Sequence, residues 1–336
     1  MNYLITGSTG LIGKALIKNL IEQADGDRVT LVLPVRDEAR ARDLLRDFIK
    51  IQNANFIFVQ CSLEQMTRDR FDLGFAIDGL IHCAAPTASL YMISNPVETA
   101  DAIVLGTKHV LELARHLNVK SMVYLSSMEA YGVVADDGRF RQEEELGNID
   151  LTSARSCYPL GKRIAEHYCH IYMQEYGVPV KIARLSQVFG KGVRPEDNRV
   201  FMQFARAAIE QKDIVLKTKG QSLGNYCATE DAVEAILLIL EKGQDGQVYN
   251  VANEENTISI YEMARLVASK VAGGRISVRI EEESNEKTGY APKTGLRMSA
   301  EKIRGLGWKP KKGMDKMYED VIEEINMTNK MRKEVK

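Results

Sequence analysis

Three side chains near the middle of the chain have the types and spacing needed for proton transfer. Tyr158 and Lys162 are four residues apart, so on a helix they share one face. Tyrosine has an unperturbed pKa of about 10, but a nearby ammonium favours the tyrosinate and makes it a usable base. Ser127 ends an apolar run and could hold a substrate oxygen while the proton leaves. Taken alone, the Tyr-x-x-x-Lys spacing is more often found on an ordinary surface helix.

A glycine-rich turn lies close to the N-terminus. The apolar run Tyr3–Thr6 leads into Gly7, Gly10 and Gly13, and a helical pattern follows. Glycines at this spacing permit a tight turn, close approach of the backbone to a pyrophosphate, and close packing of helix on strand. The alternative is a glycine turn without a ligand, but its place between a strand and a helix favours dinucleotide binding. With the Ser-Tyr-Lys set, it predicts hydride transfer to or from a nicotinamide.

The identity of the dinucleotide depends on the end of the second predicted strand, Arg28–Val35. Arg36 and Asp37 follow this strand, and Arg40 lies on the next helix. An acidic residue here would bind the ribose 2′-hydroxyl of NAD, whereas an arginine would pair with the 2′-phosphate of NADP. Because Arg36 comes first, the sequence favours NADP, although Arg36 could also be a solvated surface charge.

The elements that position these residues alternate between strand and helix. The periodicity predicts a doubly wound α/β fold with a parallel sheet covered by helices on both faces. The predicted strands are Tyr3–Thr6, Arg28–Val35, Phe56–Val59, Gly79–His82, Ser121–Ser126 and Val180–Arg184. The predicted helices are Leu11–Gln23, Glu38–Lys50, Pro96–Leu117 and Lys162–Tyr176.

Beyond residue 186 the alternation loosens and a second, smaller lobe is expected. The predicted helices are Val200–Gln211, Ala228–Lys242 and Ser259–Val271, and the predicted strands are Ile214–Lys217 and Gln247–Ala252. We expect a dinucleotide-binding domain over residues 1–185, to which 226–260 returns, and a substrate lobe built from 186–225 and 261–325. Residues 327–336 are predicted to form a frayed basic tail.

Composition excludes several classes of function. The 336 residues carry 45 basic and 46 acidic side chains, a formal net charge of −1, which argues against nucleic acid as a partner. No apolar run approaches the roughly 18 residues of a membrane span, and the first residues do not resemble a secretory signal. The five cysteines are scattered, and His167 and His170 lack a third ligand, so no metal is expected. We expect a cytoplasmic protein.

The motifs together resemble the extended short-chain dehydrogenase/reductases, the NAD-dependent epimerase/dehydratase group that acts on nucleotide sugars. The resemblance rests on the glycine turn, Ser127, and Tyr158 with Lys162, and it runs in family order to about residue 310. Further matches are His82–Ala85, Gly106-Thr107, Tyr131-Gly132, Glu166, Asp231 and Leu306–Pro310.

The resemblance implies a Rossmann-type fold, a nucleotide-sugar substrate, NADP or NAD as cofactor, and a homodimer. Tyr158 would be the general acid/base, Lys162 would adjust its pKa, and Ser127 would hold the substrate oxygen. The substrate contacts would be Ser127, Glu129, Tyr158 and Gln187, with Glu129 as a second candidate acid/base. The residues assigned to the cofactor are Gly7, Thr9, Gly10, Leu11, Ile12, Gly13, Arg36, Ser62, Leu63, Ala84, Ala85, Tyr158, Lys162 and Leu185.

Four positions depart from the family pattern. Ser62 stands where the family has an acid near the adenine, and Gln187 replaces an asparagine. Gly224 stands where many members have an arginine that binds the diphosphate, so another cation is needed; the candidates are Arg199, Lys217, Lys219 and Arg297. Met128 precedes Glu129, so half of the Asp-Glu pair of the sugar 4,6-dehydratases is missing.

The sequence leaves the reaction open. A 4-epimerase and a 4-ketoreductase at carbon C4 of the sugar are about equally favoured: Arg36 favours the reductase, and the family as a whole favours the epimerase. A 4,6-dehydratase comes third because Met128 cannot donate a proton. A catalytically silent NAD(P)-binding regulator is the alternative from another class, and the intact set of Ser127, Tyr158 and Lys162 argues against it.

Overall fold

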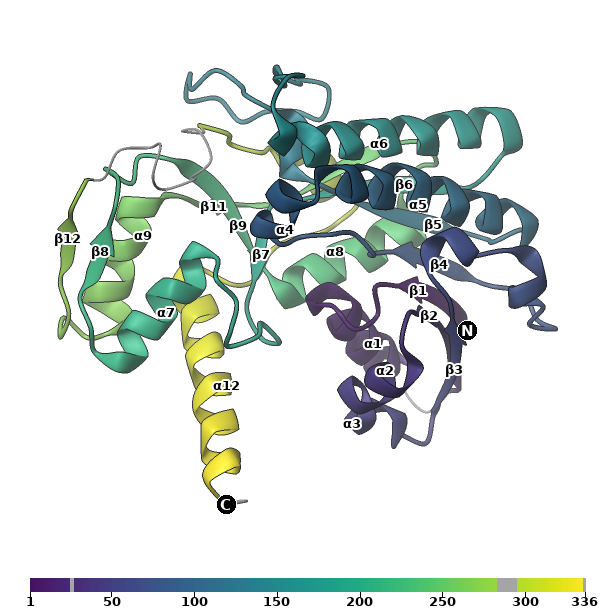
Figure 1. The fold of residues 1–336 in the computed structure, drawn as a ribbon, viewed down its shortest axis with the longest axis horizontal. Helices are drawn as coiled ribbons and strands as arrows, with labels where there is room; N and C mark the ends of the chain where they lie inside the picture. The colour runs from purple at the N-terminus through teal and green to yellow at the C-terminus, as the bar shows by residue number, and fades with distance from the viewer. Residues whose placement is uncertain (25–26, 283–294, 335–336) are drawn as a thin grey trace.

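The central feature of the computed structural model, which describes residues 1–24, 27–282 and 295–334, is a seven-stranded parallel sheet (Figure 1). Its strand order is β10-β6-β5-β4-β1-β2-β3, and every neighbouring pair is parallel. The strands are β1 (Asn2–Thr6), β2 (Val29–Val35), β3 (Ala54–Gln60), β4 (Gly79–His82), β5 (Met122–Ser127), β6 (Val180–Leu185) and β10 (Val248–Val251). The predicted doubly wound α/β class is confirmed.

Helices cover both faces of this sheet, which explains why its central strands are almost continuously apolar. One hydrophobic core joins the sheet to α1 (Leu11–Gln23) and α8 (Thr229–Lys242), and the other joins it to α5 (Pro96–His116) and α6 (Cys157–Tyr176). Shorter elements connect the strands: α2 (Glu38–Leu44), α3 (Arg46–Ile49), α4 (Ser89–Ser94), and 3₁₀ turns at Leu63–Gln65, Arg68–Phe71, Met128–Tyr131 and Ala154–Ser156.

A second group of elements has its own hydrophobic core. A three-stranded sheet has the order β11-β9-β7, and β8 pairs with β12. The strands are β7 (Gln187–Phe189), β8 (Ile214–Leu216), β9 (Leu223–Ala228), β11 (Asn253–Ser259) and β12 (Val278–Ile280). The helices are α7 (Val200–Glu210), α9 (Ile260–Leu266) with a π-helical turn at Val267–Val271, and α12 (Met314–Glu334). The short helix α11 (Glu301–Arg304) instead packs through Ile303 against the core of the main sheet.

Several elements differ from their predicted bounds. The helix predicted at Glu38–Lys50 is interrupted at Leu45, and Ser259–Val271 changes from α- to π-helix at Val267. α6 begins at Cys157, five residues before the predicted start, because Pro159 is tolerated in the first turn of a helix. The tail predicted as frayed from 327 is helical to Glu334 in α12. Of the segment 226–260, which was predicted to return to the first domain, the strand Val248–Val251 joins the main sheet beside β6. Asn253–Ser259 instead pairs with β9 in the three-stranded sheet, because the chain leaves the main sheet directly after β10.

No helix in the described part of the chain is both long and apolar enough to cross a membrane.

Candidate active site

A cleft of about 2020 Å³ opens at the carboxyl ends of the central strands, between the sheet and the second lobe. In a doubly wound sheet, ligands bind at this edge, where the strand order reverses. Every residue assigned to cofactor or substrate in the sequence analysis lines this cleft. The structure therefore brings the predicted site together, and the roles of its residues stay predictions.

Tyr158 and Lys162 lie one turn apart on α6, next to the end of β5. Both side chains are buried, with 7% and 3% of their surface exposed. The Lys162 ammonium donates a hydrogen bond to the carbonyl oxygen of Leu125 at 2.7 Å and lies 5.7 Å from the centre of the Tyr158 ring. Ser127 ends β5, and its hydroxyl accepts a hydrogen bond from the Glu129 amide at 3.2 Å. The hydrogen bond to Leu125 thus ties the lysine to the strand that presents Ser127.

Burial is the largest influence on the pKa values of Tyr158 and Lys162. It raises the pKa of Tyr158 to about 12; the Glu129 carboxylate acts in the same direction, and Ser127, Arg155 and Arg199 oppose it. Burial also lowers the pKa of Lys162 to about 8, against the attraction of Glu166. The expected lowering of the tyrosine pKa by Lys162 is therefore absent in the ligand-free cleft, because desolvation outweighs the neighbouring charges. Additional positive charge in the cleft is needed before Tyr158 ionises readily.

Arg155 is a site residue that the sequence reasoning missed. It lies in the 3₁₀ turn just before α6, and its Nη2 is 2.8 Å from Oε2 of Glu129. Its guanidinium carbon is 5.8 Å from the centre of the Tyr158 ring. The ion pair orients Glu129 beside Tyr158. Its position three residues before the tyrosine is the only signal in the sequence, since its partner lies 26 residues away.

A buried ion pair fixes the spacing of β5, β6 and α6 behind the site. Arg184 donates to both carboxylate oxygens of Glu166, at 2.9 and 2.7 Å, and the Ser126 hydroxyl donates to the same carboxylate. Both charged side chains are almost fully buried. A two-pronged arginine–carboxylate pair is geometrically specific, so it holds α6 in one register against the sheet.

The side chain of His82 is buried and forms contacts between elements. Its Nδ1 lies 2.7 Å from the Thr6 hydroxyl and its Nε2 lies 3.2 Å from the Thr107 hydroxyl. Burial lowers its pKa to about 3, so the ring stays neutral. With both nitrogens occupied, the ring links β1, β4 and α5.

The glycine turn has the geometry of an anion site. Gly7 has φ +67°, and a Cβ there would lie 2.8 Å from the Ala84 amide nitrogen. A Cβ on Gly13 would overlap the carbonyl oxygen of Gly7, whereas one on Gly10 would meet only that oxygen, at 3.3 Å. No side chain caps the N-terminus of α1, so its amides are available to a phosphate. Leu11 and Ile12 open this helix.

Arg36 is exposed at the end of β2 and lines the cleft, and it forms no ion pair with any residue that the structure describes. The Asp37 carboxylate accepts a hydrogen bond from the Arg40 amide at 2.9 Å, so it caps α2. Ser62 opens the next turn and forms a capping box with Gln65. At this end of the cleft, the Arg36 guanidinium therefore has no ion-pair partner among the described residues, while one carboxylate oxygen of Asp37 already accepts a hydrogen bond.

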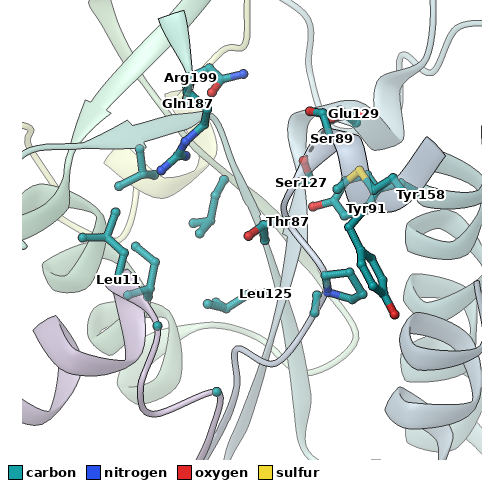
Figure 2. Close-up of a pocket in the computed structure, with 18 of the residues that line it drawn as sticks. Leu11, Thr87, Ser89, Tyr91, Leu125, Ser127, Glu129, Tyr158, Gln187 and Arg199 are labelled. Atoms are coloured by element: carbon teal, nitrogen blue, oxygen red, sulfur yellow. Dashed lines mark hydrogen bonds between the residues drawn. The ribbon is translucent and has the colours of Figure 1, made fainter. Parts of the chain in front are cut away.

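The opposite wall of the cleft comes from the second lobe. Figure 2 shows Gln187 and Arg199 facing Ser127, Glu129 and Tyr158 across the open space. Three of the four candidate cations for a diphosphate line the cleft, namely Arg199, Lys217 and Lys219. The fourth, Arg297, does not, because it pairs with Asp136 at 2.8 Å. Other lining residues that the sequence did not single out include Thr87, Ser89, Tyr91 and Arg194.

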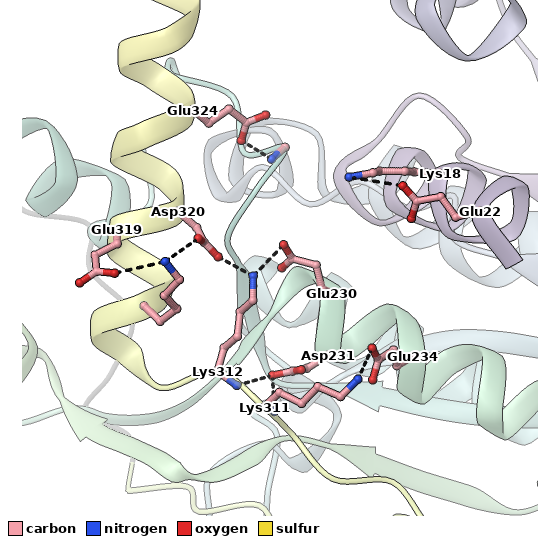
Figure 3. Close-up of polar contacts among 12 residues, drawn as sticks. Lys18, Glu22, Glu230, Asp231, Glu234, Lys311, Lys312, Glu319, Asp320 and Glu324 are labelled. Atoms are coloured by element: carbon pink, nitrogen blue, oxygen red, sulfur yellow. Dashed lines mark hydrogen bonds and ion pairs between the residues drawn. The ribbon is translucent and has the colours of Figure 1, made fainter. Parts of the chain in front are cut away.

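Two segments that match the family in sequence also contact each other. The Asp231 carboxylate accepts hydrogen bonds from the main-chain amides of Lys311 and Lys312, at 3.0 and 3.1 Å (Figure 3). The Trp308 indole donates to the main-chain oxygen of Asp231 at 3.0 Å. Asp231 therefore anchors the segment that leads into α12 to the start of α8.

Relatives of known function cover nearly the whole chain. The chain is 26% identical over 325 residues to a UDP-glucuronic acid decarboxylase of Arabidopsis thaliana, covering 95% of this chain and 88% of the relative. It is 28% identical over 308 residues to a UDP-glucuronic acid decarboxylase of Xenopus tropicalis, covering 91% and 68%. A human dTDP-D-glucose 4,6-dehydratase is 26% identical over 313 residues, covering 92% and 85%.

Solved structures share the fold. UDP-glucose 4-epimerase from Thermotoga maritima, with UDP-glucose, superposes with a TM-score of 0.80 at 22% identity, covering 98% of this chain and 99% of that one. UDP-glucuronic acid 4-epimerase from Bacillus cereus, with UDP-glucuronic acid and NAD, gives 0.78 at 19% identity, covering 98% and 100%. The sequence model of the NAD dependent epimerase/dehydratase family matches residues 3–252. Its range takes in the glycine turn, Ser127 and the Tyr158–Lys162 pair, and this chain is a member of that family.

Proposed function

We propose that the protein catalyses NAD(P)-dependent hydride transfer at a ring carbon, C4, of a nucleotide-diphosphate sugar. The observation that carries this proposal is the meeting of Ser127, Tyr158 and Lys162 beside the glycine turn in one cleft. The cleft of about 2020 Å³ is large enough for a dinucleotide and a nucleotide sugar together. Relatives named for reactions of UDP- and dTDP-sugars support the substrate class.

Each residue of the site has a separate role at the sugar hydroxyl. Ser127 holds the C4 oxygen. The Tyr158 phenolate takes the hydroxyl proton during oxidation, and the phenol so formed returns it during reduction. Lys162 stays fixed by the Leu125 carbonyl and adds positive charge behind the phenol. A bound nicotinamide supplies the hydride acceptor or donor and, when oxidised, the further positive charge that Tyr158 needs. Glu129, oriented by Arg155, is placed to contact the sugar.

The substrate diphosphate needs a cation that Gly224 cannot provide. Arg199 lines the wall opposite Tyr158, although Asp197 pairs with it at 2.7 Å. Lys217 and Lys219, just after β8, also line the cleft from the second lobe. We assign the diphosphate to this wall, because Arg297 is held outside the cleft by Asp136.

Two reactions fit this site. A 4-epimerase returns its hydride to the same substrate and can keep one cofactor bound, whereas a 4-ketoreductase exchanges its cofactor in every turnover. The unpaired Arg36 favours NADP and therefore the reductase, and the 4-epimerases among the structural neighbours favour the epimerase. A 4,6-dehydratase is less favoured because Met128 stands beside Glu129 where a second acid would be needed.

The released cofactor separates the two reactions. The purified protein is denatured, and the nucleotide in the supernatant is identified and quantified. Stoichiometric NAD would support the epimerase, and empty protein that binds NADPH would support the reductase. A protein that neither releases nor binds a nicotinamide dinucleotide would overturn the proposal. Turnover is then tested against UDP-, dTDP-, CDP- and GDP-sugars and their 4-keto forms.

A further inference from the structure

Positive charge gathers at the N-terminal end of α1, where this helix follows the glycine turn. The first turn of this helix carries no Asp or Glu, and no side chain caps it. Lys14 follows on the same helix, and its pKa is lowered by burial and then by the nearby charge of Arg194. The helix dipole adds partial positive charge at this end. Asp43 and Glu324 act on Lys14 in the opposite direction, each less strongly than Arg194. A phosphate at this helix end would therefore be stabilised by the helix dipole and by the nearby cations.

Arg194 reaches this helix end from the second lobe. It belongs to the loop between β7 and α7, and its Nη2 lies 3.5 Å from the main-chain oxygen of Thr9 in the glycine turn. This distance exceeds the 2.7–3.2 Å typical of an N–H···O hydrogen bond, so the turn does not saturate the guanidinium. The side chain is exposed, lines the cleft, and pairs with no carboxylate within residues 1–24, 27–282 and 295–334.

The loop that carries Arg194 is held in place from two sides. The Gly192 amide donates a hydrogen bond to Oε2 of Glu324 on α12 at 2.6 Å, which is drawn at Glu324 in Figure 3. A Cβ on Gly192 would lie 3.2 Å from Cδ1 of Leu11, the first residue of α1. Leu11 itself packs against the core of the second lobe. Arg194 is therefore positioned at the glycine turn by packing and is not a loosely placed surface charge.

We propose that Arg194 is a cofactor-binding residue contributed by the second lobe. Its guanidinium binds the pyrophosphate of the dinucleotide, while the amides of the glycine turn bind it from the first lobe. The planar guanidinium suits this role because it can donate two hydrogen bonds to phosphate oxygens. The inference rests on the dinucleotide binding proposed above. It follows that an occupied cofactor site ties together the turn and the loop that leads to Arg199, on the substrate wall.

The test is cofactor affinity in the absence of substrate. Dissociation constants for NADH and NADPH are measured by fluorescence titration on the wild type, Arg194→Ala and Arg194→Lys, after removal of any co-purified nucleotide. We expect Arg194→Ala to weaken both cofactors by about tenfold or more and to the same extent, because the pyrophosphate is common to them. The loss should shrink at high salt, and Arg194→Lys should restore part of the affinity.

Lys191→Ala is the matched control, since it removes a positive charge from the same loop at an exposed residue that does not line the cleft. It should leave both constants unchanged. If Arg194→Ala also leaves them unchanged, or if Lys191→Ala weakens them equally, the inference is overturned while dinucleotide binding by the wild type stands. A wild type that binds neither cofactor would overturn the proposed function together with this inference.

Discussion

At the scale of single residues, burial sets the chemistry of the cleft. Tyr158 and Lys162 are both almost inaccessible to water, and burial moves their pKa values apart, raising that of Tyr158 to about 12 and lowering that of Lys162 to about 8. The pair is thus neutral tyrosine beside a lysine that loses its charge easily. Charge brought by a ligand can shift this balance much more than it could at an exposed pair.

Tyr158→Phe removes only the phenolic oxygen. Turnover should fall by roughly 10²-fold or more, the usual scale for a general acid/base, while the dissociation constant for the cofactor stays close to that of the wild type. Steady-state kinetics and cofactor titration measure the two effects separately. Turnover near the wild-type value would remove Tyr158 from the mechanism.

Lys162→Met tests the energetic cost of the buried lysine. The folded pKa of about 8 lies below the ordinary 10.5, so the unfolded chain holds more protons between these values and the Lys162 contribution to stability rises with pH there. Below about pH 8, burial of the charged Lys162 side chain lowers the stability of the fold by roughly 3 kcal/mol, because one unit of pKa shift corresponds to about 1.4 kcal/mol. The lost hydrogen bond to Leu125 offsets about 2 kcal/mol of it, leaving a gain of roughly 1 kcal/mol at pH 7.

Urea unfolding of wild type and Lys162→Met at pH 7 and pH 10 checks this expectation. The variant should be inactive, more stable than wild type at pH 7, and no more stable at pH 10. A stability difference that does not change with pH would show that the lysine carries no such penalty.

Arg36→Asp tests the cofactor preference. A 2′-phosphate beside Arg36 would form charge-assisted hydrogen bonds, each contributing about 1.5–3 kcal/mol. The substitution removes them and places a carboxylate where it can accept from the ribose of NAD, so preference should move toward NAD by at least about tenfold. Dissociation constants for NADPH and NADH on both proteins measure the change. If wild type already prefers NADH and neither constant changes, Asp37 selects the cofactor and the NADP preference is wrong.

At the scale of elements, the glycines of the first turn have separable tasks. Gly10→Val should place a side chain in the cleft at the site of the pyrophosphate, because a Cβ there meets only the Gly7 carbonyl. We expect severe loss of cofactor binding with little change in melting temperature. Gly13→Ala is the comparison: its Cβ would overlap that same carbonyl, so it should destabilise the fold. Normal cofactor affinity in Gly10→Val would mean that the turn is only structural.

At the scale of the whole molecule, an apolar surface remains on α6, which carries Tyr158, and on its neighbour α5. Leu105 on α5 and Ile164 on α6 are 43% and 46% exposed, and the two helices pack against each other. Exposed apolar surface of this kind is typical of protein–protein interfaces. We expect a homodimer that buries it. Leu105→Arg with Ile164→Arg should give a monomer in sedimentation velocity, while Ile51→Arg, at another exposed site, should not. A monomeric wild type would contradict this expectation.

Much of this molecule could be predicted from local patterns. The glycine turn and the tyrosine–lysine spacing depend on residues close in sequence, and the alternation of strand and helix predicted the doubly wound sheet. Strands β7, β9, β11 and β12 escaped prediction because they pair with segments that are distant in the chain. The prediction began α6 at Lys162 and missed its first turn, in which Pro159 is tolerated.

The sequence by itself determined which side chains are candidates for the chemistry, because residue type and short-range spacing set which groups can share a face or a turn. Only the tertiary structure decided which charges act on them. Arg297 is drawn away by Asp136, Arg155 reaches Glu129, and Arg194 crosses from the second lobe to the glycine turn. The tertiary structure also decided that the pKa of Tyr158 is raised, because it buries the side chain. Desolvation and ion pairing both depend on distances between segments far apart in the chain, and no local pattern contains those distances.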